Sequence, residues 1–263
     1  MESCYFCRVQ LIDTHIHLYA EEYEGKQSEL IALAQLAGIQ QFLLPNIDSS
    51  SLDGLHRLVQ NYPDICIPMM GLHPCYVKED FDIELEKVRS LLADGIYKAI
   101  GEIGLDKYWD LKYLPQQEEA LRIQLQLAES YNLPVALHTR NATRETIELI
   151  KALSLTKPKG VFHCFGGTLE EAREITEMGY YLGIGGVLTF KNSGLDAIIK
   201  EIPLEYLVLE TDGPYLAPAP HRGKRNDPAM LRLIAEKLAE VKGTSLEEVA
   251  ALTSANARKL FGI

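Results

Sequence analysis

The sequence lacks any apolar run that approaches the roughly 20 residues of a membrane-spanning helix. Its first residues also lack the positively charged start and the small-residue cleavage site of a secretory signal peptide. Cysteine is scarce: five residues are scattered along a chain of 263, and an odd number in this arrangement does not indicate a disulfide framework. We therefore expect a cytoplasmic protein with reduced thiols that does not associate with membranes.

The sequence also lacks a second cysteine or histidine pair at the spacing that would complete a zinc finger with Cys4 and Cys7. We interpret this C-x-x-C as part of the lead-in to the first strand. Positive charge is in deficit too, because 26 basic residues against 37 acidic ones give a net charge of −11. An acidic surface repels nucleic acid at long range, so any attraction for such a substrate must come from a local site.

Short β-rich or apolar runs alternate with longer amphipathic stretches along the whole chain, a pattern typical of repeated β-α units and a parallel sheet. We expect eight strands, at residues 9–13, 41–46, 65–71, 97–101, 135–138, 160–163, 181–184 and 207–211. No linker, low-complexity tract or solenoid repeat divides the chain. The sequence therefore predicts an α/β fold with one domain over residues 1–263, a (β/α)8 TIM-like barrel, with an open doubly wound sheet as the alternative.

Helix signals lie between the expected strands. Apolar residues recur at helical spacing over residues 28–37, 83–93 and 115–131. Two segments match capping boxes, in which a hydroxyl side chain and a glutamate three residues later satisfy each other's amide groups. These pairs are Thr168 with Glu171 and Ser245 with Glu248, and Asp227 before Pro228 matches a cap followed by a first-turn proline.

Six side chains that can bind a metal lie at or just past the ends of the expected strands. They are His15, His17, Glu102, His138, His163 and Asp212. In a parallel barrel the carboxyl ends of all strands share one face, so these groups should converge there. His15 and His17 are two residues apart on an extended segment, which points both rings the same way. The sequence thus predicts a metal site at the carboxyl ends of the strands.

The six groups are imidazoles and carboxylates without a thiolate, which suits zinc, manganese, cobalt or iron and tolerates magnesium. Six ligands are too many for one tetrahedral ion with an open position, so we expect two divalent ions bridged by a carboxylate such as Glu102. Two ions would outweigh the charges of Glu102 and Asp212, which supplies the local attraction that an acidic protein needs to bind phosphate. A non-catalytic role, in which ions only hold the barrel together, is one alternative.

The chain resembles the TatD-type metal-dependent deoxyribonucleases of the amidohydrolase superfamily. The resemblance rests on seven motifs in order: DTHIH at 13–17, GLHP at 71–74, GEIGLD at 101–106, LPVALHTR at 133–140, HCFGG at 163–167, ETDGPYL at 210–216 and RGKRNDP at 222–228. It implies a β/α barrel that uses divalent metals for hydrolysis. It also implies that His15, His17 and Asp212 bind one ion, that His138 and His163 bind the second, and that Glu102 contacts both.

Three residues depart from the family's usual pattern. Cys75 stands where many members carry a second histidine after GLHP, Asn141 stands where an aspartate is usual after His-Thr-Arg, and Leu121 replaces a common aromatic residue. None of the three removes a ligand.

Further residues are assigned to substrate and to proton transfer. Asp212 is the expected proton acceptor and, with Glu102 and His73, forms the expected catalytic set. His73 ends the third expected strand and is placed to hydrogen-bond a phosphate oxygen or the leaving group. The expected phosphate contacts are Arg140, Arg222 and Lys224, and the expected base-stacking pair is Tyr108 with Trp109.

These expectations combine into a hydrolase that cleaves phosphodiester bonds, in the manner of a DNase acting 3′-5′ on DNA ends or single strands. The expected cofactors are two divalent ions, Zn, Mg or Mn, and the expected partner is nucleic acid, with no obligate protein partner. A metal-dependent deacylase or esterase of the same fold, acting for example on mischarged aminoacyl-tRNA, is the second enzymatic hypothesis.

Overall fold

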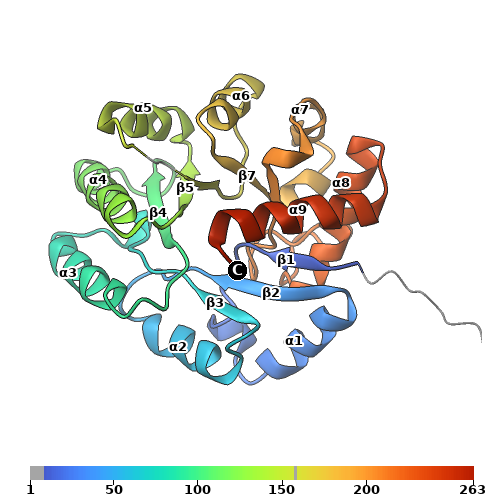
Figure 1. The fold of residues 1–263 in the computed structure, drawn as a ribbon, viewed down its shortest axis with the longest axis horizontal. Helices are drawn as coiled ribbons and strands as arrows, with labels where there is room; N and C mark the ends of the chain where they lie inside the picture. The colour runs from blue at the N-terminus through green and yellow to red at the C-terminus, as the bar shows by residue number, and fades with distance from the viewer. Residues whose placement is uncertain (1–8, 157–158) are drawn as a thin grey trace, which may run out of the picture.

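Eight parallel strands, each followed by helical structure, form the fold in the computed structural model, which describes residues 9–156 and 159–263 (Figure 1). The strands are β1 (Leu11–Asp13), β2 (Ile39–Leu44), β3 (Cys66–Pro68), β4 (Ile100–Asp106), β5 (Val135–Arg140), β6 (Gly160–Phe162), β7 (Tyr181–Ile184) and β8 (Leu207–Leu209). The interpretation of Cys4 and Cys7 falls outside the described residues.

The strands follow one another around a ring in sequence order. Strands β1–β2–β3 and β4–β5–β6–β7–β8 form two parallel sheets. At one seam the Met70 amide donates to the Ala99 carbonyl at 3.1 Å, and the Gly101 amide donates to the Met70 carbonyl at 3.0 Å. At the other, the Thr14 amide donates to the Leu209 carbonyl at 2.9 Å. These bonds join the sheets on both sides, so the predicted (β/α)8 barrel is confirmed and the open sheet is wrong.

Most of the helices surround this ring, and the last one along the chain lies across one of its ends, as Figure 1 shows. They are α1 (Gln27–Leu36), α2 (Leu52–Asn61), α3 (Phe81–Leu92), α4 (Leu114–Tyr131), α5 (Thr143–Leu153), α6 (Leu169–Glu177), α7 (Leu195–Glu201), α8 (Leu231–Lys242) and α9 (Leu246–Phe261). Within residues 9–156 and 159–263, no helix combines the length and the hydropathy of a membrane span. The three helices predicted from periodicity are confirmed to within two residues at each end, as α1, α3 and α4.

The predicted helix caps are confirmed in part. Thr168 and Glu171 form the reciprocal capping box at the start of α6. At the start of α9 the Ser245 hydroxyl accepts from the Glu248 amide, but the Glu248 carboxylate contacts the Thr244 hydroxyl instead of completing the box. Asp227 is the N-cap residue of the short 3-10 helix Pro228–Met230, with Pro228 in its first turn as predicted, but its carboxylate pairs with Arg225 at 2.8 Å instead of making a capping bond.

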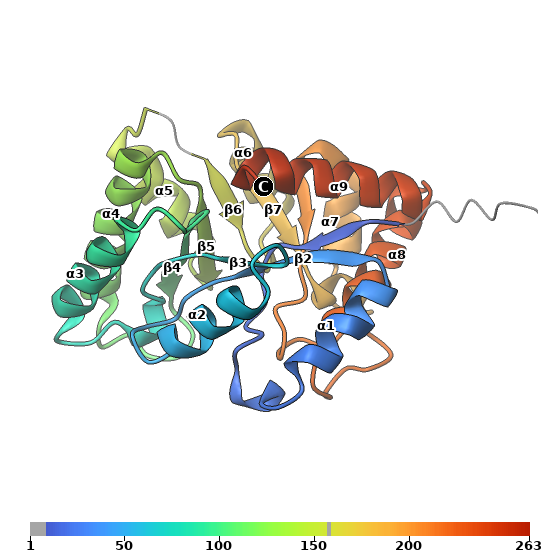
Figure 2. The same ribbon diagram turned by 60° about the horizontal axis from the view of Figure 1, so that its bottom comes forward.

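Helix α9 closes the amino-terminal end of the barrel. Its Ala257, Leu260 and Phe261 pack into a buried cluster with inward-facing strand residues such as Ile12 and Val208. The Asn256 side chain donates to the carbonyl of Leu207, where β8 begins. The loops that follow β1 and β8 lie at the opposite end, as Figure 2 shows. A site at the carboxyl ends of the strands is therefore open on the side that α9 leaves free.

Strand β4 differs most from its predicted bounds. It begins at Ile100 and runs through Asp106, with an irregular register against β5 between Ile100 and Ile103. Glu102 is thus inside the strand instead of just after it, and His138 likewise lies within β5. Acidic residues interrupt the apolar pattern of 100–106, which hides a strand that is buried along its whole length.

Candidate metal centre

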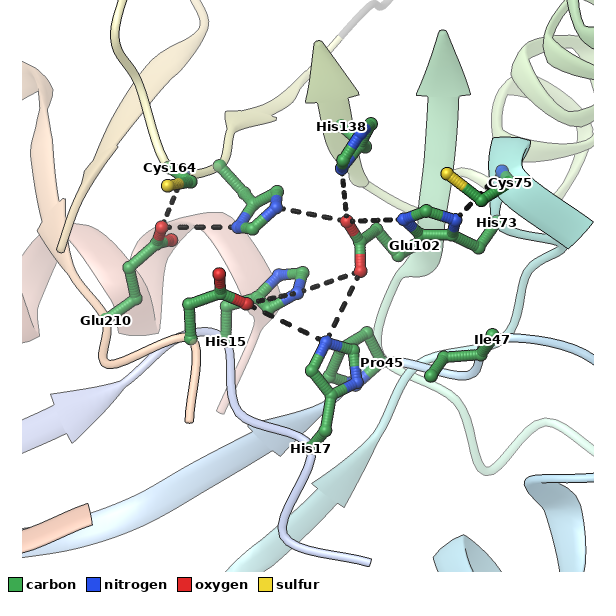
Figure 3. A network of polar contacts seen from close by, with 12 residues as sticks. His15, His17, Pro45, Ile47, His73, Cys75, Glu102, His138, Cys164 and Glu210 are labelled. Atoms are coloured by element: carbon green, nitrogen blue, oxygen red, sulfur yellow. Dashed lines mark hydrogen bonds and ion pairs between the residues drawn. The ribbon is translucent and has the colours of Figure 1, made fainter. Parts of the chain in front are cut away.

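The carboxylate of Glu102 lies at the centre of the site, ringed by imidazoles (Figure 3). It is carried by β4 at the irregular register with β5, and only 2% of the residue is exposed. The neighbouring Gly101 is needed for this packing, because a Cβ there would lie 2.7 Å from the Ala136 side chain. The carboxylate is therefore held rigidly, with both oxygens available to groups from other strands.

One Glu102 oxygen, Oε2, faces the segment that follows β1. His15 Nε2 lies 3.1 Å from it and His17 Nε2 lies 3.5 Å from it. The same two nitrogens lie 3.9 Å and 3.8 Å from Asp212 Oδ1, at the end of β8. His15, His17 and Asp212 thus form a group whose ligand atoms are close enough to hold one ion.

The other oxygen, Oε1, faces three imidazoles from different strand ends. His138 Nδ1 lies at 2.9 Å, His163 Nε2 at 3.0 Å and His73 Nε2 at 3.3 Å. By distance alone, the possible ligand atoms of His73, His138 and Glu102 form one group. Those of His163, His15 and Glu102 form another. The rings of His15 and His163 are stacked, with centroids 3.7 Å apart. The described residues therefore offer two sets of nitrogens on opposite oxygens of one carboxylate.

For two of the rings, hydrogen bonds on the side away from Glu102 indicate which nitrogen carries the proton. The Cys75 amide donates to His73 Nδ1 at 3.1 Å, so neutral His73 is protonated on Nε2 and presents a donor to Glu102. The Tyr19 hydroxyl donates to the Pro45 carbonyl and accepts from His17 Nδ1, which leaves a lone pair on His17 Nε2. His17 is thus prepared to bind a cation, whereas His73 is prepared to donate.

Two further imidazoles are backed by carboxylates. Asp106 Oδ2 lies 2.8 Å from His138 Nε2, and Glu210 Oε1 lies 3.2 Å from His163 Nδ1. Glu210 also accepts from the Cys164 amide (Figure 3). A carboxylate behind an imidazole fixes its tautomer and raises its basicity toward a metal. In both cases the nitrogen left facing Glu102 is the one that could bind an ion.

The ends of β1 and β8 are fastened to each other by side chains. Asp13 accepts from the Thr211 hydroxyl at 2.6 Å, from the Thr211 amide at 3.0 Å and from the His15 amide at 3.2 Å. The Asn226 side chain donates to the Thr211 and Tyr215 carbonyls, both at 2.7 Å. These bonds hold His15 and the turn that carries Asp212 in one fixed arrangement.

Burial and mutual charge shift the pKa values of the site. Burial opposes the charge on Glu102, but the surrounding imidazoles outweigh it and hold its pKa well below the ordinary value. Burial also lowers the pKa of His163, yet Glu102 and Glu210 raise it well above the ordinary value. Burial lowers the pKa of His15 to about 4 and that of His17 to about 3, so both are neutral at pH 7. Burial raises the pKa of Asp212 to about 7.

The donor set fits divalent cations. Neutral imidazoles with free lone pairs and carboxylates that bridge or flank them are the ligands of zinc, manganese and related ions in hydrolases. A packed core without a cation would not gather five imidazoles around one buried carboxylate, because each polar group loses its hydration there. The clusters on the two Glu102 oxygens are therefore able to bind metal.

A cavity of about 1250 Å³ opens over this cluster. Its floor includes His17, Glu102 and Asp212, and its wall includes Arg140 at the end of β5 and Trp109 after β4. Such a cavity admits a sizeable ligand and brings it directly onto the cluster.

Comparison with known proteins gives the family. A family model described as TatD related DNase matches residues 12–262. The chain belongs to the TatD family. It is 37% identical to YabD of Bacillus subtilis, an uncharacterized metal-dependent hydrolase, over 96% of this chain and 99% of that protein. It is 34% identical to the 3′-5′ ssDNA/RNA exonuclease TatD of Citrobacter rodentium, over 96% of this chain and 98% of that protein.

The fold comparison agrees with the family. The crystal structure of YjjV, a TatD homologue from Escherichia coli, matches with a TM-score of 0.91 at 30% identity and covers 96% of this chain and 98% of that one. The protein is therefore a metal-dependent hydrolase of the TatD family.

The three departures from the usual TatD pattern fall in different surroundings. Cys75 and Asn141 both line the cavity, and Asn141 has a left-handed backbone with φ of 53°. The Cys75 amide, not its side chain, makes the bond that orients His73. Leu121 is fully buried in α4 and faces the helix–strand core. Only Cys75 and Asn141 are thus placed where a ligand in the cavity would meet them.

The structure does not bring Arg222 and Lys224 to the cavity. Neither is among its lining residues, and the Arg222 guanidinium lies 4.5 Å from the centroid of the Phe190 ring. Their contact with flanking phosphates stays a prediction. Arg140, by contrast, lies on the cavity wall as expected.

Residues outside the predicted site also shape it. Asp106 and Asn226 orient the cluster, although sequence reasoning gave them no role. The available signal was spacing for Asp106, because it lies four residues beyond Glu102 on a strand, where alternate residues share a face. Asn226 had no such signal, since its loop reaches the Asp212 turn only in three dimensions.

Proposed function

We propose that this TatD-family protein hydrolyses phosphodiester bonds in nucleic acid, acting as a 3′-5′ exonuclease on DNA ends or single strands. The observation that carries the proposal is the division of nitrogens between the two oxygens of one carboxylate. Glu102 Oε2 faces His15 and His17, and Glu102 Oε1 faces His138 and His163. This arrangement suits two divalent ions that share a carboxylate, the form of site used for in-line displacement at phosphorus.

In this proposal His15, His17 and Asp212 would hold one ion, His138 and His163 would hold the second, and Glu102 would contact both. Divalent ions bound there would supply Lewis-acid activation of water and neutralise charge on the phosphate. The chain's own groups do the rest: Asp106 and Glu210 fix the orientation of the His138 and His163 rings.

Two residues act on the substrate directly. Asp212 takes the proton from the water whose oxygen forms the new bond to phosphorus, while the bond to the leaving oxygen breaks. Its position supports this role, because it lines the cavity and lies beside His15 and His17. His73 donates its Nε2 hydrogen to a phosphate or leaving oxygen, since the Cys75 amide holds that proton in place.

Nucleic acid is the substrate class that the surroundings favour. Arg140 on the cavity wall can attract a flanking phosphate. Two relatives at 34% and 32% identity are named 3′-5′ ssDNA/RNA exonucleases. Because the whole chain carries a net charge of −11, local cations are needed to hold a polyanion.

The test is a substrate panel. Chelator-treated protein, reloaded separately with Zn²⁺, Mg²⁺ or Mn²⁺, is incubated with end-labelled single-stranded DNA, duplex DNA, RNA and an aminoacyl ester. We expect metal-dependent release of mononucleotides from the 3′ end of the DNA. The Asp212→Asn variant, saturated with the same metal, should lose most of its turnover. Cleavage confined to the ester would show a deacylase instead, and equal activity without metal would refute the two-ion site.

A further inference from the structure

An exposed pair of aromatic side chains lies beside the candidate metal centre, in the loop that follows β4. Trp109 is 68% exposed and Tyr108 is 53% exposed, although large aromatic rings are usually buried. Their rings meet edge to face with centroids 4.9 Å apart. Trp109 lines the same cavity as Glu102 and His138. An apolar face left open on a catalytic cavity indicates a ligand with an apolar face of its own.

Arg140 completes this surface from the neighbouring strand. Its guanidinium lies 3.7 Å from the centroid of the Tyr108 ring and 5.2 Å from that of Trp109. Within residues 9–156 and 159–263 no carboxylate forms a salt bridge with Arg140. The guanidinium is thus held by the aromatic rings with its charge uncompensated, as in surfaces that bind a base and its phosphate together.

One carboxylate fixes the position of the aromatic pair relative to the candidate metal centre. Asp106 Oδ1 accepts from the Tyr108 amide at 2.9 Å and from the Trp109 amide at 3.0 Å. The other oxygen of Asp106 lies 2.8 Å from His138 Nε2. The loop is therefore anchored at its start to the side chain that orients a cluster imidazole. A ligand on Trp109 and a phosphate at the cluster would be at a fixed separation.

We propose that Trp109, supported by Tyr108 and Arg140, is a stacking subsite for an unpaired nucleobase. The base would belong to a strand that has one of its phosphates at the candidate metal centre. The identity of that phosphate as the scissile one rests on the proposed function. Every base has an aromatic face, so the subsite favours unpaired over paired strands without selecting a sequence. In a duplex the faces of the bases are already covered by their neighbours, and Trp109 has nothing to stack on.

The sequence offers a direct reporter, because Trp109 is its only tryptophan. Metal-loaded Asp212→Asn protein, which should not cut the strand, is titrated with a short oligothymidylate and with an abasic phosphodiester oligomer of equal length. Both carry the same charge at the same salt concentration. We expect the thymidylate to quench Trp109 emission and the abasic oligomer to leave it unchanged. Equal quenching by both oligomers, or quenching by neither, would overturn the subsite.

Variants give the energetic test. In the same background, Trp109→Ala should weaken binding of labelled oligothymidylate, measured by fluorescence anisotropy, by roughly 5- to 150-fold, the range expected when one stacked base is lost. Trp109→Phe should weaken it less, and binding of the abasic oligomer should not respond. Leu111→Ala is the matched control, since Leu111 is exposed in the same loop but does not line the cavity. Equal weakening of both oligomers by Trp109→Ala would contradict stacking.

The proposed function has a separate readout. Wild-type protein loaded with each metal is assayed on bis(para-nitrophenyl) phosphate, which has no nucleobase, and on DNA. Absence of all phosphodiester turnover, with base-dependent quenching intact, would sink the proposed function and support the subsite. Turnover of DNA without base-dependent quenching would refute the subsite and leave the proposed function standing.

Discussion

Replacing Asp106 with asparagine tests how the chain prepares His138 for a cation. The introduced amide side chain can keep its oxygen toward the Tyr108 and Trp109 amides, so the loop after β4 should stay in place. Its nitrogen then faces His138 Nε2 and donates to it. The proton of a neutral ring must move to Nδ1, which is the atom that faces Glu102 Oε1. The lone pair that would bind the second ion is lost.

The expected magnitude follows from the burial of this contact. Only 1% of Asp106 is exposed, so water cannot replace the carboxylate behind the ring. Loss of such a supporting group weakens metal binding by about 10- to 100-fold, or roughly 1.4 to 2.7 kcal/mol. Calorimetric titration of chelator-treated protein with Mn²⁺ should show this loss for one of two ions. The ion held by His15, His17 and Asp212 should bind as before, because Asp106 contacts none of them.

The matched control is Asp110→Asn, in the same loop. Asp110 is exposed and, among the described residues, accepts only from the Lys112 amide at 2.8 Å, so its replacement should change neither affinity. Unchanged binding of both ions to the Asp106→Asn variant would refute the role assigned to the carboxylate. A loss confined to the His15 and His17 ion would refute the division of ligands between the two Glu102 oxygens.

Three further outcomes are expected. Metal added at about 100 times its dissociation constant should stabilise chelator-treated protein by about 2.7 kcal/mol for each ion bound, seen as a higher melting temperature, and Glu102→Gln should remove most of this gain. Gly104→Ala should lower the free energy of unfolding in urea by about 3 kcal/mol or more, because φ is 148° and the new Cβ would lie 1.9 Å from the His138 carbonyl oxygen. Asn226→Ala should lower it by roughly 2–4 kcal/mol and reduce turnover, since the buried Thr211 carbonyl and the partly buried Tyr215 carbonyl lose their donor; unchanged turnover would show that these two bonds do not position Asp212.

The predicted ligand cluster came from a general property of parallel barrels. Because all strands run the same way, a polar side chain at any strand's carboxyl end meets the others, whatever their separation in sequence. His15, His163 and Asp212 could be placed together on that ground, and the structure brings them together. Strand β7 was predicted with its observed bounds, because its residues form a short apolar run between turn residues.

The supporting carboxylate of Asp106 could not be predicted in the same way. Strand β4 continues through Asp106 although Glu102 and Asp106 break its apolar pattern, because imidazoles and amides from other elements compensate their charges. The contact between Asp106 and His138 is a tertiary property that the residues around Asp106 do not predict. The same holds for Asn226, whose partners lie 11 and 15 residues away along the chain. Sequence pattern thus identified the groups of the candidate metal centre, but not Asp106 and Asn226, which orient them.

The net negative charge of the protein affects how its site can bind a polyanion. Carboxylates of Glu102, Asp106 and Glu210 are buried in or beside the cluster, on a chain whose net charge is already −11. A polyanion is repelled by such a site until cations occupy it, so in the proposed function substrate binding has to follow metal binding. Stacking on Trp109 adds affinity that does not depend on charge, and therefore does not attract the long duplexes that a basic surface would hold.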